Sequence, residues 1–399
     1  MKLLILNSCV SGGGAGRSLE AYFKHISPEI DAHVVMPEPG VIGETLSPKA
    51  NLWFIPEFVE RIHRSPYKLR PWLNHPYVHI LINLFVLGKA AKRISTLAKE
   101  IKPDTIYCNH MLANPVGAYI GWKLNIPVVF HARNIHVAWF GRLSYTFLAK
   151  LDGVKAIICN SEASAELFLR TVPEKVKIIH NFLDTSKFDR TNIIPALRQE
   201  YAIPSNAIVA GYLGRILPKK GVDVLIRAFQ KVYERCPNLY LVILGGNDGG
   251  IKNDLQSEYR DLCDTLGIGD RVIFTGFKKD IRPYMVDFDF VVLPSVEPES
   301  FGRVLIEGMA YSIPSITTDI GGAVEVIKHQ VNGLHVPPRD ATILAQALET
   351  LASDHEFRKN MGKRGHDRLL TEFSSHVLAD QISNVFTGSP QADKLNVAV

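Results

Sequence analysis

The sequence is poor in cysteine and has no C-x-x-C pair. Its 399 residues include five cysteines, an odd number scattered along the chain: Cys9, Cys108, Cys159, Cys236 and Cys263. Several of them lie at or beside apolar segments that we expect to be strands, which is typical of reduced thiols in a core and not of a disulfide framework or a zinc site. We therefore expect a protein of a reducing compartment, the cytoplasm.

A run long enough to cross a membrane is also missing. The longest apolar stretch spans eleven residues at 78–88 and contains His79 and Asn83, whereas a bilayer span requires about twenty. The apolar run before Cys9 covers only 3–6, which is too short for the apolar part of a signal peptide. We expect neither a membrane-spanning helix nor a signal peptide.

Three motifs of cofactor chemistry are incomplete. The glycine-rich segment NSCVSGGGAGRSLEAYF has Gly12 and Gly14, but it has Arg17 where a dinucleotide-binding fingerprint needs its third glycine. The P-loop pattern G-x-x-x-x-G-K-[ST] does not occur. The only Asp-x-Asp, Asp287 and Asp289, enters an apolar strand instead of leaving it, and no His, Cys, Asp or Glu cluster has the spacing of metal ligands. We predict that the protein needs no metal and no cofactor.

Short apolar runs that alternate with helical patterns fill most of the chain. With 46% hydrophobic and 21% charged residues, the protein is predicted to be globular. Runs such as KLLILN, DTIYCN, AIVAGYLG and FDFVVLPS are continuously apolar and end in turn residues, which is typical of buried parallel strands. They form two series, so we predict an α/β protein with two Rossmann-like, doubly wound domains.

The domain boundary is expected where the apolar density drops. Polar residues and prolines accumulate at 181–206, which is typical of a linker. We place the first domain at 1–185 and the second at 200–370. The segment at about 371–388 has the spacing of an amphipathic helix, which would cross back to the first domain.

Positive charge is concentrated in one segment. Residues 51–100 carry eight Lys or Arg against three Glu, an excess that equals the net charge of the whole chain, +5. Trp53, Phe54 and Trp72 lie among them. Such a segment suits the anionic inner face of a membrane, but an ordinary solvated face has the same composition. Both interpretations stay open, and no nucleic-acid partner is predicted.

A cationic loop follows the first strand of the second series. In GRILPKKG, Gly214 ends the strand, Arg215 follows it, and Lys220 leads into a helix that begins near Val222. Ligands of open α/β sheets bind at the carboxyl ends of the strands. The Arg fork and the Lys ammonium at that place suit a diphosphate.

A second loop, ESFGRVLIE, offers backbone amides. We expect a helix at about 301–311 with Ser300 as its N-cap. The amides of Phe301, Gly302 and Arg303 would then be available to an anion, because the first amides of a helix have no partner within it.

Two carboxylates flank those amides. Glu299 lies before the expected helix start and Glu307 lies two turns inside it. Carboxylates accept hydrogen bonds from neutral hydroxyl pairs such as a ribose diol. We predict that the two acids bind the sugars of a ligand whose phosphates are bound by the cations and amides, although an exposed helix acid is the alternative for Glu307.

Four motifs together resemble those of the retaining nucleotide-sugar glycosyltransferases with the GT-B fold, of the group 1 and family 4 type. They are the paired carboxylates of ESFGRVLIE, the G-R-x4-K-G of GRILPKKG, IIHNFLD at 178–184 and GGAVEVIKHQVNGLHVPP at 321–338. The resemblance covers nearly the whole chain. It implies two domains facing across a cleft and transfer of a hexose from a nucleotide-diphosphate sugar to a glycan or lipid-linked acceptor, in polysaccharide or cell-envelope glycan biosynthesis.

The resemblance also implies roles for individual residues. Arg215 and Lys220 would neutralise the donor diphosphate, Glu307 would bind the nucleotide ribose, and Glu299 would contact the donor sugar. His131, at the end of IPVVFHARN, matches a histidine near the anomeric centre, and a strand-end histidine of structural role is its alternative.

Further positions would complete the donor site. The amides around Phe301 and Gly302 would add to the phosphate cradle, while Gly13 and Gly14 would face the donor from the first domain. Phe182 in NFLD stands where this family commonly has a glycine, so the conformation of that loop is open.

Three rival functions stay open at this level. A sugar-nucleotide 2-epimerase shares the fold but acts on the donor alone. A catalytically silent subunit would keep the fold without turnover, against which the intact cations and carboxylates argue. A nicotinamide dehydrogenase is disfavoured by the missing glycine. The base, the sugar, the acceptor, the oligomeric state and the choice between front-face attack and a covalent intermediate cannot be inferred from the residues.

Overall fold

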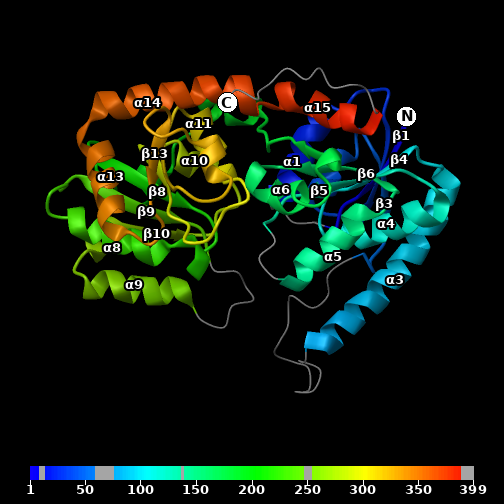
Figure 1. Ribbon diagram of the computed structural model, residues 1–399. Helices are drawn as coiled ribbons and strands as arrows, with labels where there is room; N and C mark the ends of the chain where they lie inside the picture. Colours follow the sequence, from blue (N-terminus) through cyan, green and yellow to red (C-terminus); the bar gives the residue numbers. More distant parts are fainter. Residues whose placement is uncertain (9–13, 59–75, 136–138, 247–253, 388–399) are drawn as a thin grey trace. The chain divides into compact units, whose positions relative to one another are not determined.

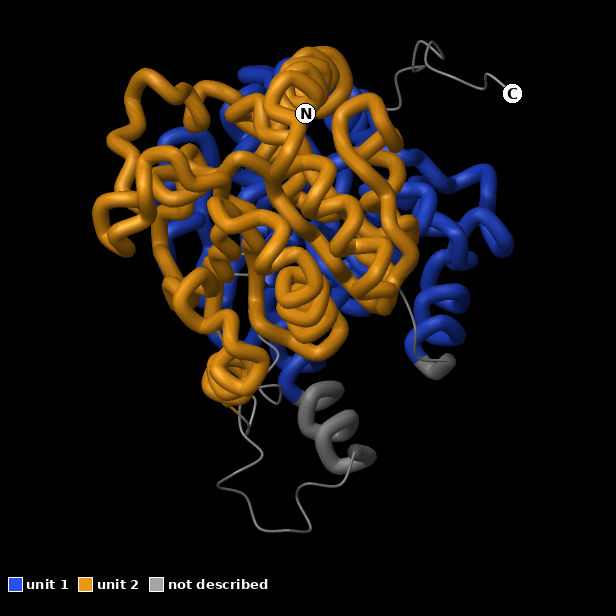
Figure 2. The backbone as a smooth tube through the Cα atoms, turned by 90° about the vertical axis from the view of Figure 1, so that its left-hand side faces the viewer, with its two compact units in different colours: residues 1–182, 375–399 blue, residues 183–374 orange. Residues whose placement is uncertain are grey.

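The computed structural model describes residues 1–8, 14–58, 76–135, 139–246 and 254–387. The chain divides into two compact units. Unit 1 comprises residues 1–182 and 375–399, and unit 2 comprises residues 183–374 (Figure 2). Each unit is built around its own parallel sheet, so the expected two-domain α/β fold is confirmed.

Unit 1 contains a parallel sheet with the strand order β3-β2-β1-β4-β5-β6-β7 (Figure 1). Its strands are β1 Lys2–Leu6, β2 Asp31–Met36, β3 Asn51–Phe54, β4 Thr105–Cys108, β5 Val128–Ala132, β6 Val154–Cys159 and β7 Val176–Ile178. The order reverses between β1 and β4, and in such sheets ligands bind outside the carboxyl ends of the strands at this switch point.

Helices cover both faces of this sheet. They are α1 Gly14–Lys24, α2 Val41–Leu46, α3 Pro76–Ile101, α4 Ala113–Leu124, α5 Trp139–Lys150, α6 Glu162–Leu169 and α15 Ser375–Thr387. Side chains of α3, α4, α5 and α6 form one core with the sheet, and those of α1, α2 and α15 form the other. Successive strand residues alternate between the two cores, because strand side chains point to opposite faces.

Unit 2 repeats the arrangement with the order β10-β9-β8-β11-β12-β13. Its strands are β8 Ile208–Leu213, β9 Leu239–Leu244, β10 Val272–Gly276, β11 Phe290–Leu293, β12 Ser315–Thr318 and β13 Gly333–Val336. The switch point of this sheet lies between β8 and β11, which pair directly.

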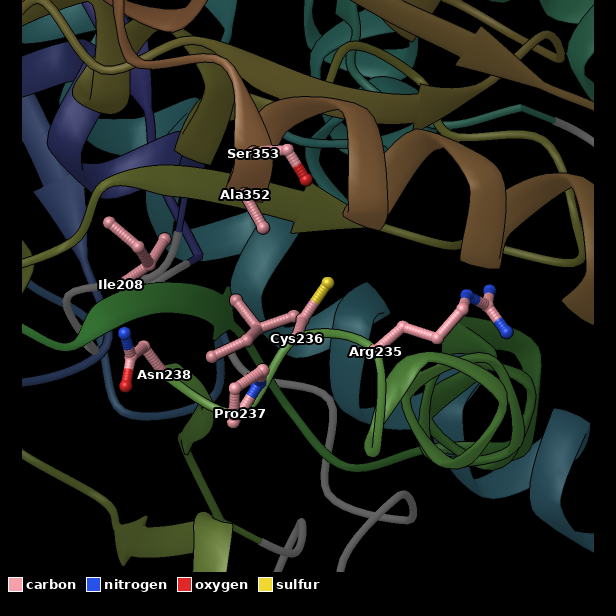
Figure 3. Close-up of a pocket in the computed structure, with 8 residues that line it drawn as sticks. Ile208, Arg235, Cys236, Pro237, Asn238, Ala352 and Ser353 are labelled. Carbon is pink, nitrogen blue, oxygen red and sulfur yellow. The ribbon is translucent and has the colours of Figure 1, made fainter.

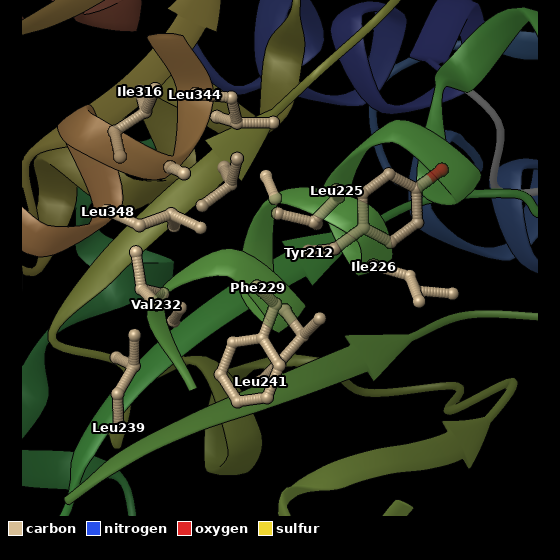
Figure 4. Packing of buried hydrophobic residues seen from close by; sticks show 14 of the residues in the cluster. Tyr212, Leu225, Ile226, Phe229, Val232, Leu239, Leu241, Ile316, Leu344 and Leu348 are labelled. Atoms are coloured by element: carbon tan, nitrogen blue, oxygen red, sulfur yellow. The ribbon is translucent and has the colours of Figure 1, made fainter. Parts of the chain in front are cut away.

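The helices of unit 2 bury apolar faces against the sheet. They are α7 Leu197–Glu200, α8 Val222–Val232, α9 Leu255–Thr265, α10 Arg282–Met285, α11 Arg303–Ala310, α12 Ala323–Val326, α13 Ala341–Ser353 and α14 His355–Arg368. In α8, Leu225, Ile226 and Phe229 recur at helical spacing and are fully buried. They pack between the sheet and α13, with Leu344 and Leu348 opposite them (Figure 4).

The stretch after residue 182 packs on unit 2 along much of its length. Leu183 is buried beside α11, and Leu197 and Ile203 are buried in the core that contains α10. Phe182, the departure noted in NFLD, is buried in the core of unit 1. Its side chain therefore has a packing role, which explains why a large apolar residue is accepted there.

Candidate functional site

The cationic loop and the acidic loop of unit 2 meet at the switch point of its sheet. Gly214 directly follows β8, and Pro294 directly follows β11. The backbone amide of Val296 donates to the carbonyl of Lys219 at 2.9 Å. This bond ties the loop after β11 to the loop after β8, so the side chains of both loops gather at one carboxyl edge.

Lys220 and Glu299 form an ion pair at this edge. The ammonium of Lys220 donates to the carboxylate of Glu299. The hydroxyl of Ser295 donates to the same carboxylate oxygen at 2.5 Å, and the amide of Gly322 donates to the Glu299 carbonyl at 2.7 Å. Glu299 is therefore positioned through both its side chain and its backbone, with the ammonium held beside it.

The turn that carries Lys220 requires glycine at its end. Lys220 lies in a 3-10 turn at 218–220, and Gly221 follows with φ +66°. A Cβ on Gly221 would lie 2.1 Å from the carbonyl oxygen of Pro294. Glycine thus permits both the left-handed backbone and the close approach of the two loops.

Arg215 lies on the exposed side of the same loop. Its carbonyl accepts a 2.6 Å hydrogen bond from the hydroxyl of Tyr212, the strand residue three positions earlier. Burial raises the pKa of Tyr212, and the negative charge of Glu299 adds to the effect. The neutral phenol therefore fixes the backbone from which Arg215 projects.

The expected helix after Glu299 begins later than predicted. The structure places its start at Arg303, with Gly302 as the N-cap at φ +82°, so the prediction of Ser300 as N-cap was wrong. Gly302 reaches the left-handed region without a steric penalty and ends the loop there. Ser300 and Phe301 belong to the loop, and the Phe301 ring points into the core, where it packs edge-on against Phe373 at 5.9 Å.

Glu307 is a buried acid. Only 1% of the residue is exposed, and its carboxylate accepts a 3.1 Å hydrogen bond from Nε of Arg303, one turn earlier. The alternative of an exposed helix acid is therefore excluded. A buried carboxylate needs a partner, and Arg303 supplies one at the start of the helix.

A polar cluster lies at the carboxyl edge of the unit 1 sheet. His131, in β5, is 2% exposed, and its Nδ1 lies 2.6 Å from the hydroxyl oxygen of Tyr107 in β4. The Tyr107 hydroxyl also donates to Oδ1 of Asn109 at 3.1 Å. Nε2 of His131 is buried, and within the described part of the chain it has no hydrogen-bond partner.

Asn109 is the centre of this cluster. Its Oδ1 accepts from Arg133 at 2.9 Å, and its Nδ2 donates to Oδ1 of Asn7 at 3.1 Å. Arg133 also donates to Oδ1 of Asn181 at 2.9 Å. Ser18 of helix α1 donates to the same Asn181 oxygen at 3.2 Å. These contacts join the ends of β1, β4 and β5 to α1 and to the stretch before residue 183.

Burial and the Arg133 guanidinium determine the charge state of the nearby histidines. Burial lowers the pKa of His131 well below 6.5, and the positive charge of Arg133 lowers it further. The same two causes lower the pKa of His110. At neutral pH both rings are therefore uncharged and can accept or donate one hydrogen bond at each nitrogen.

The predicted residues thus fall into two groups. Glu299, Ser300, Phe301, Gly302 and Glu307 lie in unit 2, as do Gly214, Arg215 and Lys220, and the contact of Lys220 with Glu299 joins the two loops. His131 and Gly14 lie in unit 1, with Gly14 at the start of α1. Gly13 lies outside the described residues.

Sequence reasoning missed Asn7, Asn109 and Arg133. A signal was present, since an asparagine ends the runs KLLILN, DTIYCN and KAIICN. A polar residue directly after a buried parallel strand lies at the edge where ligands bind. This pattern does not predict which side chains contact one another, because the contacts of Asn109 join residues that are distant along the chain.

The Asp-x-Asp of unit 2 has a structural role. Asp289 accepts from the amide of Val209 at 2.9 Å and pairs with Arg358, and Asp287 pairs with Arg198. Within the described ranges no group of three or more His, Cys, Asp or Glu side chains could hold a metal ion. Metal independence stays a prediction, as does the absence of a cofactor.

The basic segment at 51–100 is only partly described. Trp53 and Phe54 in β3 are partly exposed, and Arg93 of α3 forms an ion pair with Glu57 at 2.7 Å. The prediction for residues 59–75 falls outside the described residues. None of the helices in the described part of the chain is long and apolar enough to span a membrane.

A small pocket in unit 2 lies away from the cations and carboxylates. It is lined by residues at the amino ends of β8 and β9, among them Ile208, Cys236 and Leu239, together with Ser353 at the end of α13 (Figure 3). Lys220 and Glu299 follow the carboxyl ends of their strands, so this pocket is not part of the candidate site.

Two protein-family models together match nearly the whole chain. Residues 12–187 match the family model described as Glycosyltransferase Family 4, and residues 193–368 match the model described as Glycosyl transferases group 1. The two matches correspond closely to the two units.

Individual relatives and a solved structure agree with this match. The uncharacterized glycosyltransferase MJ1607 of Methanocaldococcus jannaschii is 27% identical over 355 residues, covering 83% of this chain and 86% of that protein. The lipopolysaccharide core biosynthesis glycosyltransferase LpsE of Rhizobium meliloti is 29% identical over 246 residues, 61% of this chain and 68% of that protein. The crystal structure of Anabaena HepE in complex with UDP and glucose superposes with a TM-score of 0.78 at 25% identity, covering 97% of this chain and 100% of that one.

Proposed function

Because the chain belongs to the group 1 and family 4 glycosyltransferases and has the GT-B fold, we propose that it transfers a hexose from a nucleotide-diphosphate sugar to a glycan or lipid-linked acceptor, with retention of anomeric configuration. The observation that carries this proposal is the pairing of Lys220 with Glu299 at the carboxyl edge of the unit 2 sheet. It brings a phosphate-binding cation and a hydroxyl-binding carboxylate to one place.

Lys220 would stabilise the leaving diphosphate. Cleavage of the bond between sugar and diphosphate increases the negative charge of the leaving group, and only interactions that strengthen in the transition state increase the rate. A cation about 4 Å from the phosphate contributes roughly 4 kcal/mol at an effective dielectric constant near 20. Arg215 on the same loop would add a second cation, so no metal ion is required in this proposal.

Glu299 would bind the donor sugar once its ion pair with the Lys220 ammonium is broken. In the structure its carboxylate is the partner of Lys220. A bound diphosphate would compete for the ammonium, and the Glu299 carboxylate, still fixed by Ser295, would then accept from sugar hydroxyls. Glu307 would bind the ribose, because a buried carboxylate offers strong acceptor oxygens to a neutral diol.

His131 would act as a neutral group toward the reacting sugar. Its ring is uncharged at neutral pH because burial and Arg133 lower its pKa. A neutral ring places no positive charge beside a sugar that itself becomes positively charged as the bond breaks. Support for this role comes from the position of the histidine at the carboxyl edge of β5.

The proposed glycan or lipid-linked acceptor indicates where in the cell the enzyme works. We propose a cytoplasmic enzyme of polysaccharide or cell-envelope glycan biosynthesis that works at the inner face of the membrane. The similarity to a lipopolysaccharide core glycosyltransferase and to a UDP-binding structure supports this setting and a nucleotide-sugar donor.

A thermal-shift screen with nucleotides and nucleotide sugars tests the donor, because a ligand that binds only the folded state raises the melting temperature. Product analysis with the stabilising donor, first alone and then with lipid-linked acceptors, tests the reaction. Conversion of the donor alone to a free nucleotide and an epimerised sugar would favour a 2-epimerase. Stabilisation without any product would favour a silent subunit.

A further inference from the structure

The last turn of α15 packs against a buried tyrosine of β4. The rings of Phe386 and Tyr107 lie 4.9 Å apart between their centroids and are tilted by 54°. Phe386 is 7% exposed and Tyr107 is 1% exposed, and both belong to the core that α1, α2 and α15 form with the sheet. Aromatic rings at such a distance attract one another beyond the effect of burial. The position of Tyr107 therefore depends on a residue at the end of α15.

Tyr107 is also the residue that holds His131. Its hydroxyl donates its one proton to Oδ1 of Asn109 at 3.1 Å, so toward Nδ1 of His131, at 2.6 Å, it can only accept. This hydrogen bond orients the His131 ring and leaves the buried Nε2 available to a ligand. Because the strength of a hydrogen bond depends steeply on its distance and angle, a displacement of the Tyr107 ring would change the orientation of the histidine.

Helix α15 is fixed to α1 near both of its ends (Figure 1). The hydroxyl of its first residue, Ser375, lies 2.8 Å from Nε2 of His25. Near its other end, the hydroxyl of Ser383 lies 3.1 Å from that of Tyr22, whose ring packs edge-on against Phe386 at 6.2 Å. These contacts hold α15 in register with α1, so the Phe386 ring has one defined position in the core.

We propose that Phe386 is a positioning residue for sugar transfer. Its ring holds Tyr107 where the tyrosine hydroxyl accepts from His131, and it thereby directs Nε2 of the histidine. The inference rests on the proposed role of His131 toward the reacting sugar. It extends the candidate site to α15, which the chain reaches only after unit 2 is complete.

Loss of the Phe386 ring would act on His131 through Tyr107. Truncation of a buried ring to alanine leaves a cavity that the surrounding side chains fill only in part. The Tyr107 ring can then move into this space, or its hydroxyl can bind water, and in both cases the Nδ1 proton of His131 loses a well-placed acceptor. A displacement of about 1 Å in a reacting site costs roughly a hundredfold in rate, so turnover should respond more strongly than stability alone would explain.

NMR of the 15N-labelled histidine rings tests the packing relation without a substrate. The signals of His131 are identified by their absence from His131→Gln. In the parent chain we expect one tautomer, with the proton on Nδ1. Phe386→Ala should move the Nε2 signal toward the average of two tautomers, whereas Phe386→Leu, which refills much of the space, should restore the parent signal.

The matched control is Leu378→Ala. Leu378 is 5% exposed in the same core and lies two turns before Phe386, about 12 Å along the helix axis. Its truncation should destabilise unit 1 to a similar extent and leave the His131 signals unchanged. All spectra are recorded at a temperature at which circular dichroism shows each variant to be folded.

Turnover with saturating donor and acceptor separates positioning from stability. Phe386→Ala should lower kcat about tenfold to a hundredfold relative to Leu378→Ala, while the affinity for the nucleotide diphosphate, which the proposed site in unit 2 binds, stays unchanged. A parent-like His131 signal in Phe386→Ala, or equal changes in both alanine variants, would overturn the inference. A mixed signal with undiminished turnover would instead remove His131 from the proposed reaction, and with it the role of Phe386 in transfer.

Discussion

The hydroxyl oxygen of Tyr107 lies 2.6 Å from Nδ1 of His131 and 3.1 Å from Oδ1 of Asn109. Arg133, which can only donate, fixes that Asn109 atom as an oxygen. Tyr107 must then donate its single proton to Asn109, and His131 must donate from Nδ1 to Tyr107. This leaves the buried Nε2 as an acceptor, which suits a sugar hydroxyl.

We therefore predict that His131 carries its proton on Nδ1. In 15N NMR of the ring nitrogens, Nε2 should show the shift of an unprotonated nitrogen between pH 6 and pH 8. Tyr107→Phe removes the acceptor of the Nδ1 proton and should mix the two tautomers. A protonated Nε2 in the parent chain would contradict the assignment.

The stability of unit 1 should fall in mild acid. The folded pKa of His131 lies well below the unfolded value of 6.5, so below that pH the unfolded state binds more protons and the free energy of unfolding decreases as the pH falls. One such group changes it by about 1.4 kcal/mol per pH unit, and above pH 6.5 the effect is absent. His131→Gln should reduce this slope by that amount.

Tryptophan fluorescence can follow this transition in urea. All four tryptophans, Trp53, Trp72, Trp122 and Trp139, belong to the chain segment of unit 1, so the signal reports on that unit alone. If His131→Gln and the parent chain show the same slope between pH 5 and pH 6.5, the buried ring is not the group responsible.

Lys220→Ala should reduce turnover by about a thousandfold, because it removes roughly 4 kcal/mol of stabilisation from the leaving diphosphate. The matched control is Lys219→Ala. Lys219 is exposed on the same turn, and its backbone carbonyl accepts a hydrogen bond from the amide of Val296 in the loop after β11. Initial rates with a saturating donor measure both variants. Similar rates for the two would remove Lys220 from the site.

Glu307→Gln should weaken donor binding by about tenfold to a hundredfold, the range expected when a hydrogen bond to a charged group is lost. The amide keeps an acceptor for Arg303, so the fold should persist. Glu372→Gln is the control, since Glu372 forms a more exposed pair with Arg368 at the same four-residue spacing. Calorimetric titration with the nucleotide diphosphate compares them. Unchanged affinity in Glu307→Gln would exclude the ribose contact.

Gly221→Ala should destabilise unit 2 more than Gly267→Ala. Both glycines have similar left-handed φ values, +66° and +69°, but a Cβ meets the Pro294 carbonyl at 2.1 Å only at Gly221 and meets nothing within 4 Å at Gly267. We expect a loss of about 1 kcal/mol at Gly267 from the backbone alone and about 3 kcal/mol at Gly221. Differential scanning calorimetry measures the loss of stability in each variant. Equal losses in the two variants would show that the loops can separate at no cost.

The fold could be predicted because its strands carry a strong local signal. Runs such as IVAGYL and LVIL are apolar on both faces, as buried parallel strands must be. β12 reads SITT and has no such apolar run, although it lies inside the sheet between β11 and β13. Thr318 is buried there, and its hydroxyl donates to the carbonyl of Ser295 at 2.8 Å. Local hydrophobicity cannot reveal a polar strand whose hydroxyls find partners only in the folded chain.

The site could be predicted only in part, and for a similar reason. Charged residues in loops after two neighbouring strands can be recognised in the sequence. Lys220 and Glu299 were therefore expected to lie together, and the structure places them in an ion pair. The N-cap at Gly302 was not predicted, because Ser300, two residues earlier, is of a residue type that more often caps helices. The Arg133 contacts join residues 24 and 48 positions apart, and no local pattern carries that information.

The return of the chain to unit 1 has a consequence for the order in which the protein can fold. The last strand of that unit ends at Ile178, yet Leu378, Ala379, Ile382 and Phe386 of α15 complete one of its cores. During synthesis on a ribosome, unit 2 can fold as soon as residues 183–374 have emerged. The sheet of unit 1 is synthesised earlier, but its core is complete only when α15 has emerged. We therefore expect the unit translated first to mature last, with its open core the part most dependent on chaperones during synthesis.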